Sequence, residues 1–352
     1  MARAYAALRD RLLVCRAVGD HDPVPSDWTT VTRLEGHTLE CVAASADAPE
    51  RVFVGTFEGS EARGASELGG LHRSTDGGDT FERLETGSDF VSDTVMSLTV
   101  SPHDPDVVYA GTEPSRVYRS TDGGDSWSHL EGIVDLPSAE EWYFPPRPHT
   151  HHVRWLEVDP VDPDRLYAGI EAGAFVYTED GGETWHERPE GARRDNHSLA
   201  THPDREGRVY AAAGDGYAES DDGGERWRQP QRGLEHTYCW SVVPDPGDPG
   251  RVLVSSASGA SRAHTAGSAE SYVYRKADGE PWERLEDRGL PTGEGVVRAV
   301  FDTPGRPGVV YAVTNRGLFV TDDFGDEWER VEIEWDEALE TGTPRGIVTL
   351  PS

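Results

Sequence analysis

Short runs of alternating apolar and polar residues fill most of the chain, and turn-forming residues separate them. Between residues 95 and 130 the runs are VMSLTV, VVYAGT, VYRS and SWSHL, with Asp104-Pro105 after the first run and Gly123-Gly124 before the last. Alternation with a period of two is typical of half-buried strands, and Asp-Pro and Gly-Gly pairs favour tight turns. This segment is therefore predicted to form a four-stranded antiparallel sheet.

The same pattern recurs along the chain, and its most regular part is a motif of the form S/T-x-D-x-G-x-x-W, as in STDGGDSW, TEDGGETW and SDDGGERW. The aromatic residues that end this motif, or its degenerate copies, recur about every fifty residues, and the two ends of the chain together supply one further repeat. The aromatic positions are Trp28, Phe81, Trp127, Trp185, Trp227, Trp282 and Trp328. Seven repeats lie within the range of roughly four to eight blades seen in β-propellers.

The predicted fold is all-β, a seven-bladed β-propeller of four-stranded antiparallel blades that forms a single domain over residues 1–352. The last blade is expected to combine a C-terminal strand at about residues 346–350 with N-terminal strands at about 12–15 and 28–34. Pairing of this kind joins the first blade to the last and leaves no open edge in the ring.

The repeated motif resembles the Asp-box, or BNR, repeat of sialidase-like propellers. The DPDVVYAGT and STDGG strings are also similar to those of xyloglucan-degrading propellers, and the photosystem II assembly factor, a seven-bladed ring that binds protein, resembles the chain as well. In this family the motif caps a hairpin, so the resemblance implies a structural role for residues such as Asp122 and Trp127. The Arg-Ile-Pro motif of catalytic sialidases does not precede the first repeat, and no sialidase catalytic residue is carried over.

Charge narrows the range of partners and surroundings. The chain has 65 acidic residues against 33 Lys and Arg, for a net charge of −32, and Lys276 is its one lysine. We therefore expect neither nucleic acid nor an anionic membrane as a partner, and we expect a halophilic protein whose carboxylates are screened by salt. The N-terminus lacks the apolar run of a secretory signal, and no stretch approaches the roughly 18 apolar residues of a spanning helix, so the expected location is cytoplasmic.

Propeller topology sorts the connections between strands onto two faces. The Asp-Pro turns and the Asp-Gly-Gly turns share one face, called here the turn face, and both are short. The connections between blades and between second and third strands share the other, the loop face, where they vary in length and where binding residues are expected. The longest connection spans about residues 131–152, with Trp142 and Tyr143 as a predicted ligand-binding wall, and polar inserts occupy about residues 59–70 and 255–271.

Candidate chemistry gathers on the loop face near the innermost strands. Aligned on the following turn, His152 and His236 lie three positions before the equivalent of Ser97, and His197 lies one position before it. Imidazoles from several blades would suit a divalent metal such as zinc or manganese. The predicted metal ligands are His37, His152, His197 and His236, and the predicted catalytic residues are Glu40, Arg154, Tyr238 and Arg298, of which the two arginines could bind a substrate carboxylate.

Two functions remain open from the sequence. The first is a ligand-binding site at the central funnel for a small molecule or glycan-like ligand, with a metal-dependent hydrolase or lyase activity. The second is a non-catalytic scaffold that binds a protein through the same loops, in which case the histidines are merely solvated or hydrogen-bonded. Motifs of serine hydrolases, zinc proteases and phosphate-binding loops do not occur in the sequence.

Overall fold

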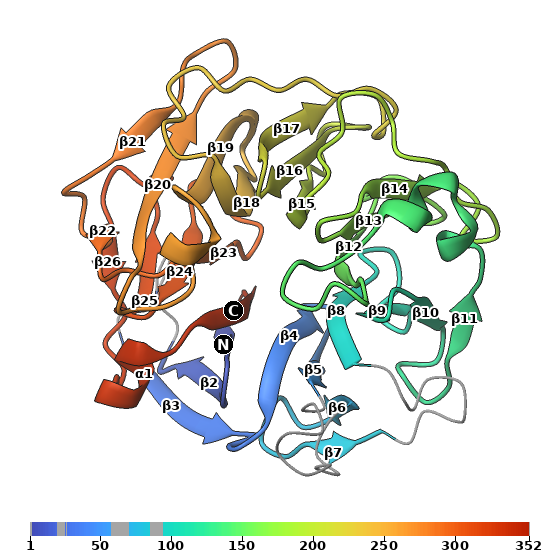
Figure 1. Ribbon diagram of the computed structural model, residues 1–352. Coiled ribbons are helices and arrows are strands. Elements are labelled where there is room, and N and C mark those ends of the chain that lie inside the picture. Colours follow the sequence, from blue (N-terminus) through green and yellow to red (C-terminus); the bar gives the residue numbers. More distant parts are fainter. Residues whose placement is uncertain (1, 20–24, 26, 58–69, 85–93, 352) are drawn as a thin grey trace.

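Seven small antiparallel sheets stand around a central axis in the computed structural model, which describes residues 2–19, 25, 27–57, 70–84 and 94–351. Figure 1 shows the ring they form, and the fold is an all-β, seven-bladed β-propeller as predicted. The innermost strand of each blade contacts the innermost strand of the next, in the cyclic order β4, β8, β12, β15, β18, β23 and β27.

The blades follow one another along the chain. Blade 1 contains β4 (Thr38–Ser45), β5 (Ala48–Phe57), β6 (Gly70–Ser74) and β7 (Glu82–Arg83). Blade 2 contains β8 (Thr94–Val100), β9 (Val108–Glu113), β10 (Val117–Ser120) and β11 (Ser128–Leu130). Blade 3 contains β12 (Val153–Val158), β13 (Leu166–Ile170) and β14 (Phe175–Thr178), and blade 4 contains β15 (Asn196–Thr201), β16 (Val209–Ala213) and β17 (Gly216–Ser220).

Blade 5 contains β18 (Tyr238–Asp245), β19 (Asp248–Ala257), β20 (Glu270–Lys276) and β21 (Glu283–Leu285), with β22 (Gly293–Glu294) paired to β20. Blade 6 contains β23 (Val300–Asp302), β24 (Val310–Thr314), β25 (Gly317–Thr321) and β26 (Glu329–Arg330). In blades 3 and 4 the fourth strand is reduced to single bridges, Tyr177 with His186 and Glu219 with Arg228. The helices are short: η2 (Ile133–Asp135), η3 (Pro137–Glu141), η4 (Ala260–Arg262) and α1 (Glu337–Thr341).

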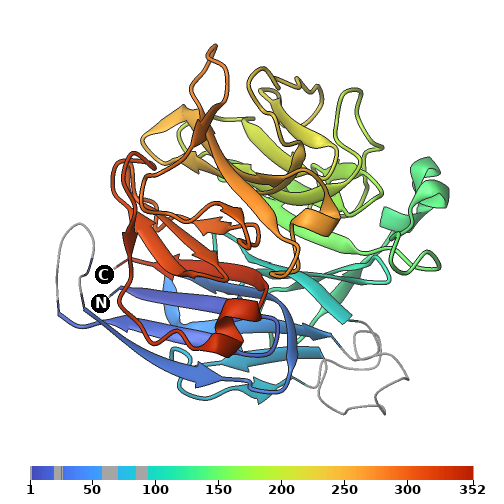
Figure 2. The ribbon, with the colours of Figure 1, turned by 60° about the vertical axis from the view of Figure 1, so that its left-hand side comes forward.

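The two ends of the chain close the ring in blade 7. Its innermost strand is β27 (Pro344–Leu350), followed outward by β1 (Arg3–Leu8), β2 (Leu12–Ala17) and β3 (Trp28–Arg33). Figures 1 and 2 show the N- and C-termini side by side, as the pairing of Tyr5 with Val348 requires. The predicted closure is confirmed, and the structure adds β1, which the sequence analysis did not assign.

The repeated hairpin motif is held by its own side chains. In blade 2 the Ser120 hydroxyl donates to Asp122 and accepts from the Gly124 amide, each at 2.8 Å, while Asp122 accepts from both the amide and the hydroxyl of Ser126. These bonds, with those from Ser126 the strongest, lower the pKa of Asp122 to about 2. The same bonding recurs at Asp76, Asp180, Asp222 and Asp323.

Apolar side chains between the sheets form the core. One cluster joins Phe53 of blade 1 to Val95 and Tyr118 of blade 2, and another joins Tyr167 of blade 3 to Leu199 of blade 4. Each sheet is therefore buried on both faces by its neighbours, which fixes the innermost strands relative to one another. The helices among the described residues are all too short to cross a lipid bilayer.

Candidate functional site

In six of the seven blades, the innermost strand has one extra residue near its start that has no partner in the neighbouring strand. In β4, for example, Leu39 and Cys41 pair with adjacent residues of β5, and Glu40 between them has no partner. Such a β-bulge redirects the side chain of the extra residue, and bulges are common beside active sites. The six extra residues, called here the bulge ring, are Glu40, Met96, Arg154, His197, Trp240 and Arg345.

Residues of the bulge ring from different blades contact one another. The Arg154 guanidinium lies 5.0 Å from the centre of the Trp240 ring, and the His197 and Trp240 rings are 4.4 Å apart. Arg345 Nη1 lies 3.6 Å from Glu40 Oε2. The bulges therefore bring charged and aromatic groups together at the loop-face end of the central channel.

The register agrees with the sequence alignment in three blades and differs in one. Glu40, Arg154 and His197 each precede the residue that is equivalent to Ser97. In β18 that equivalent is Ser241, so Trp240 rather than Tyr238 occupies the bulge. The alignment of this blade was wrong by two residues, because it counted back from a degenerate turn, and the same error placed His236 too close to the axis.

His197 presents an unpaired nitrogen to two carboxylates. Its side chain is 1% exposed, and its Nδ1 donates a hydrogen bond of 2.6 Å to the backbone oxygen of Cys239. That bond fixes the proton on Nδ1, which leaves a lone pair on Nε2. Nε2 has no hydrogen-bond partner and lies 3.8 Å from Asp195 Oδ1 and 3.9 Å from Glu171 Oε1.

The two carboxylates come from loops of neighbouring blades. Glu171 directly follows β13, and Asp195 directly precedes β15, where its Oδ1 accepts a 2.8 Å hydrogen bond from the Ala172 amide. The ligand atoms of Glu171, Asp195 and His197 lie within 4.8 Å of one another. Burial raises the pKa of Asp195, whereas the hydrogen bond from His152 and the nearby positive charges outweigh burial and lower the pKa of Glu171.

His152 connects this group to the long loop of residues 131–152. Its Nε2 lies 2.9 Å from Glu171 Oε2, and its Nδ1 lies 3.1 Å from Glu113 Oε2. Burial opposes a charge on His152, but the two carboxylates outweigh burial and raise its pKa. Glu113 in turn accepts two hydrogen bonds from the Arg147 guanidinium. Because both nitrogens face carboxylates, His152 positions Glu171 here rather than offering a free lone pair to a metal.

Arg298 is a fully buried cation without a carboxylate partner among the described residues. Its side chain is 0% exposed, its guanidinium stacks 3.9 Å from the centre of the Trp240 ring, and neither Nη atom has a hydrogen-bond partner. Burial, followed by the charges of Arg345 and Arg154, holds the pKa of Arg298 well below its usual value. An arrangement with buried, unpaired donors of this kind favours an anion.

His264, which the sequence analysis did not single out, links Tyr238 to Arg298. Arg298 Nε donates to His264 Nδ1 at 3.3 Å, so His264 Nε2 carries the proton that Tyr238 accepts at 3.0 Å. The hydroxyl proton of Tyr238 is thereby left for another acceptor. Burial, and then the charges of Glu171 and Asp195, raise the pKa of Tyr238, so the phenol is neutral.

Four predicted residues are not brought to this group. The Nδ1 of His236 lies 2.5 Å from the Tyr274 hydroxyl and its ring stacks on Tyr272, while His37 packs against the ring of His72. Trp142 is only 5% exposed and donates from its indole to Ser138, whereas Tyr143 is 46% exposed. Trp142 therefore belongs to the core beneath the long loop and cannot form an open wall for a ligand. The insert at 59–70, apart from Gly70, lies outside the described residues.

Sequence reasoning missed Glu113, Glu171 and Asp195, although one signal was available for the first two. Both follow the same string in consecutive repeats, YAGTE at Glu113 and YAGIE at Glu171, so a position-by-position comparison of repeats would have paired them. Asp195 lies in a connection between blades and has no such signal. Trp240, His264 and Arg345 were likewise assigned no role.

No protein-family model and no curated protein matches the chain. Solved structures share its fold at low identity. A GH74 xyloglucanase from Xanthomonas campestris matches with a TM-score of 0.62 and 18% identity, over 91% of this chain and 52% of that one. An ancestral GH74 enzyme matches with a TM-score of 0.62 and 16% identity, over 85% of this chain and 39% of that one. The chain thus spans about half, or less, of the length of these enzymes.

YCF48, solved with a bound D1 peptide, matches with a TM-score of 0.59 and 17% identity. This match covers 90% of the present chain and 94% of YCF48. The likeness to both groups is a likeness of fold, and at such identities function must be argued from the site itself.

Proposed function

We propose that the protein binds a divalent metal ion together with a small carboxylate-bearing ligand, such as an acidic sugar, at the loop-face end of its central channel. A hydrolase or lyase reaction is the activity that this combination of groups suits best. The observation that carries the proposal is the unpaired Nε2 of the buried His197, which faces Glu171 and Asp195.

The donor set fits a borderline divalent cation. One imidazole and two carboxylates suit zinc or manganese and leave coordination positions for a ligand. A carboxylate that is withdrawn even partly from water is costly without a counter-charge, and the half-buried Asp195 has no cationic group within hydrogen-bonding distance among the described residues. When bound, the ion would polarise a ligand oxygen or lower the pKa of a water molecule.

The chain's own groups would act around that position. Arg298, with Arg154 and Arg345 beside it, would bind the ligand carboxylate through its free Nη donors. Tyr238 would donate its hydroxyl proton to a ligand oxygen, and His152 would hold Glu171 in place. Glu40 lies by Arg345 and would limit how far that guanidinium reaches.

Metal binding tests the proposal directly. Protein purified without a histidine tag and freed of metal should take up one zinc or manganese ion per chain, measured by elemental analysis after dialysis and by calorimetric titration. His197→Gln should abolish uptake, because it removes the only neutral nitrogen donor of the group. His236→Gln is the matched control and should bind as the unaltered protein does, since His236 contacts Tyr272 and Tyr274.

Two results would count against the proposal: no stoichiometric uptake of either ion, or equal uptake by His197→Gln. A ligand screen then follows with the metal-loaded protein, using small carboxylates and acidic sugars. Arg298→Lys should weaken the binding of these anions without changing metal uptake, because lysine keeps the charge but loses the forked donors.

The scaffold reading is the second candidate, and the fold shared with peptide-bound YCF48 favours it. A scaffold of this kind would need an exposed apolar surface along residues 142–146. Most aromatic side chains of this segment are instead packed against the protein. Trp142 is in the core, and Phe144 packs against the ring of His152 and the guanidinium of Arg147, which leaves Tyr143 as the exposed aromatic side chain. If a partner protein binds the Tyr143→Ala variant as tightly as the unaltered protein, residues 142–146 are excluded as its binding surface.

Membership of the Asp-box repeat family is also an inference, and the recurring side-chain bonds at Asp76, Asp122, Asp180, Asp222 and Asp323 support it. Adaptation to high salt and a cytoplasmic location stay predictions from composition.

A further inference from the structure

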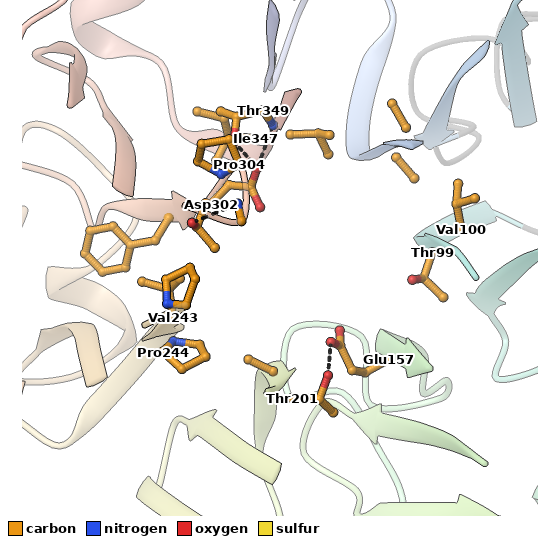
Figure 3. Close-up of a pocket in the computed structure, with 18 of the residues that line it drawn as sticks. Thr99, Val100, Glu157, Thr201, Val243, Pro244, Asp302, Pro304, Ile347 and Thr349 are labelled. Carbon is orange, nitrogen blue, oxygen red and sulfur yellow. Dashed lines mark hydrogen bonds between the residues drawn. The ribbon is translucent and has the colours of Figure 1, made fainter. Parts of the chain in front are cut away.

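A cavity lies at the turn-face end of the central channel, opposite the group around His197. Its volume is about 590 Å³, and it is lined by the ends of the innermost strands and by the turns that follow them. Figure 3 shows side chains from several blades around this opening, among them Glu157, Val243, Asp302 and Ile347. A cavity of this size is large enough for a small organic molecule.

The walls contain one register-equivalent residue from each innermost strand. Each of these residues pairs with a tyrosine, phenylalanine or leucine of the neighbouring strand. The seven residues, called here the lower ring, are Ala43, Thr99, Glu157, Ala200, Val243, Asp302 and Val348. Five are small or apolar, and two are acidic. Glu157 belongs to blade 3 and Asp302 to blade 6, so they face the channel from nearly opposite sides.

Among the described residues, neither carboxylate has a cationic partner. Glu157 accepts hydrogen bonds from the Thr201 hydroxyl at 3.0 Å and the Trp155 indole at 3.3 Å. Asp302 accepts from the amide and the hydroxyl of Thr349, each at 2.6 Å. The described lining residues include no Lys or Arg, and their other titratable groups are His202, which is bonded to the Asp245 backbone, and Asp204.

Both carboxyl groups have a raised pKa, because burial disfavours their charged forms. Burial raises the pKa of Glu157 to about 7 and that of Asp302 to about 6, and the charge of Asp302 adds to the shift at Glu157. The chain has 33 Lys and Arg residues, yet none of those that the structure describes lines this cavity. A cationic ligand would supply the counter-charge that the described lining residues lack.

We propose that this turn-face cavity binds a linear aliphatic diammonium ion. One ammonium group pairs with Glu157 and the other with Asp302, and the methylene chain between them contacts Val243, Ile347 and the other apolar walls. A single metal ion fits less well, because it would need both carboxylates at one point. The site is separate from the proposed metal group, so it stands or falls independently of the proposed function.

Calorimetric titration with a series of unbranched diamines of increasing length tests the site, in buffer of high ionic strength to suppress non-specific attraction to the acidic surface. One diamine length should bind best, with one ion per chain. A monoamine of the same carbon number should bind about tenfold more weakly or worse, because one carboxylate stays unpaired.

Glu157→Gln and Asp302→Asn should each weaken diamine binding by about tenfold or more. Both substitutions remove the charge of a half-buried carboxylate and keep the side-chain shape, so folding is retained, which circular dichroism checks. Glu327→Gln, an exposed acid on the surface, is the control for net charge and should bind normally. His197→Gln should also bind normally, since His197 lies at the other end of the channel.

Three outcomes would overturn the proposal. These are no saturable diamine binding, equal affinity for the diamine and the matched monoamine, and unchanged affinity in both Glu157→Gln and Asp302→Asn. Saturable binding of calcium or magnesium that both variants abolish, with no diamine effect, would identify a metal site and likewise overturn it.

Discussion

Two fully buried cations show how differently single residues are used in this ring. Lys276, the one lysine of the chain, is 3% exposed and lies 2.9 Å from Glu219 Oε2, which also pairs with Arg208. Arg298 is also buried, at 0% exposure, but its neighbours Arg154 and Arg345 carry the same charge. Lys276 is therefore a satisfied structural cation, whereas the Nη donors of Arg298 have no partner among the described residues, as the proposed anion-binding role requires.

This contrast predicts opposite effects on stability. Lys276→Met should lower the free energy of unfolding by about 2–4 kcal/mol, because it leaves Glu219 with less compensation in the core. Arg298→Met should leave it unchanged or raise it by about 1–2 kcal/mol, because an unpaired buried charge is replaced by an apolar side chain. Denaturant unfolding in high salt measures both. Equal destabilisation by the two variants would show that Arg298 is structural as well.

At the scale of the element, the repeated hairpin depends on glycines that serve both conformation and packing. Gly124 has a φ of +90°, and a Cβ at this position would lie 2.8 Å from Cε1 of Phe53 in the preceding blade. Gly124 is therefore required both for the positive φ of the turn and for its close packing against the preceding blade. Gly36 has a similar φ of +85°, but a Cβ there would meet nothing within 4 Å.

Alanine substitutions at Gly36 and Gly124 distinguish the cost of backbone strain from the cost of packing against Phe53. Gly36→Ala should cost about 1–2 kcal/mol of stability, the penalty of a left-handed backbone for a residue with a Cβ. Gly124→Ala should cost about 1–3 kcal/mol more, because Phe53 must also move. Denaturant midpoints of the two variants, measured together, give the difference. Equal losses would mean that the blades adjust to each other without cost.

At the scale of the whole molecule, the seven blades form a closed ring because the two chain ends share blade 7. β27 is the innermost strand of that blade and contacts β4 of blade 1 and β23 of blade 6. It also supplies Arg345 to the bulge ring and Val348 to the lower ring. One terminal strand therefore completes both the fold and the two ends of the channel.

Removing residues 343–352 should open the ring, lower the melting temperature and promote aggregation, because β1 loses its pairing with β27 and that edge is exposed. A synthetic peptide of the same ten residues should restore part of the lost stability when added in trans. Removal of residues 351–352 alone is the control and should have little effect. Thermal unfolding and size-exclusion chromatography report the outcome, and an unchanged melting temperature after the longer deletion would contradict it.

The sequence by itself determined the repeat number, the antiparallel blades and the closure in blade 7, because period-two alternation, turn residues and repeated aromatics all act over a few neighbouring positions. It also placed Glu40, Arg154 and His197 on one side of their strands, since those depend only on distance from a regular turn.

Only the tertiary structure decided which side chains meet. Glu171 and Asp195 approach His197 because two loops of adjacent blades converge on it, and His236 is excluded because β18 is shifted by two residues from the alignment. Glu157 and Asp302 share a cavity although they lie 145 positions apart in the sequence. Contacts across a ring depend on how the sheets pack around the axis, and that packing is a property of the whole molecule that no local pattern contains.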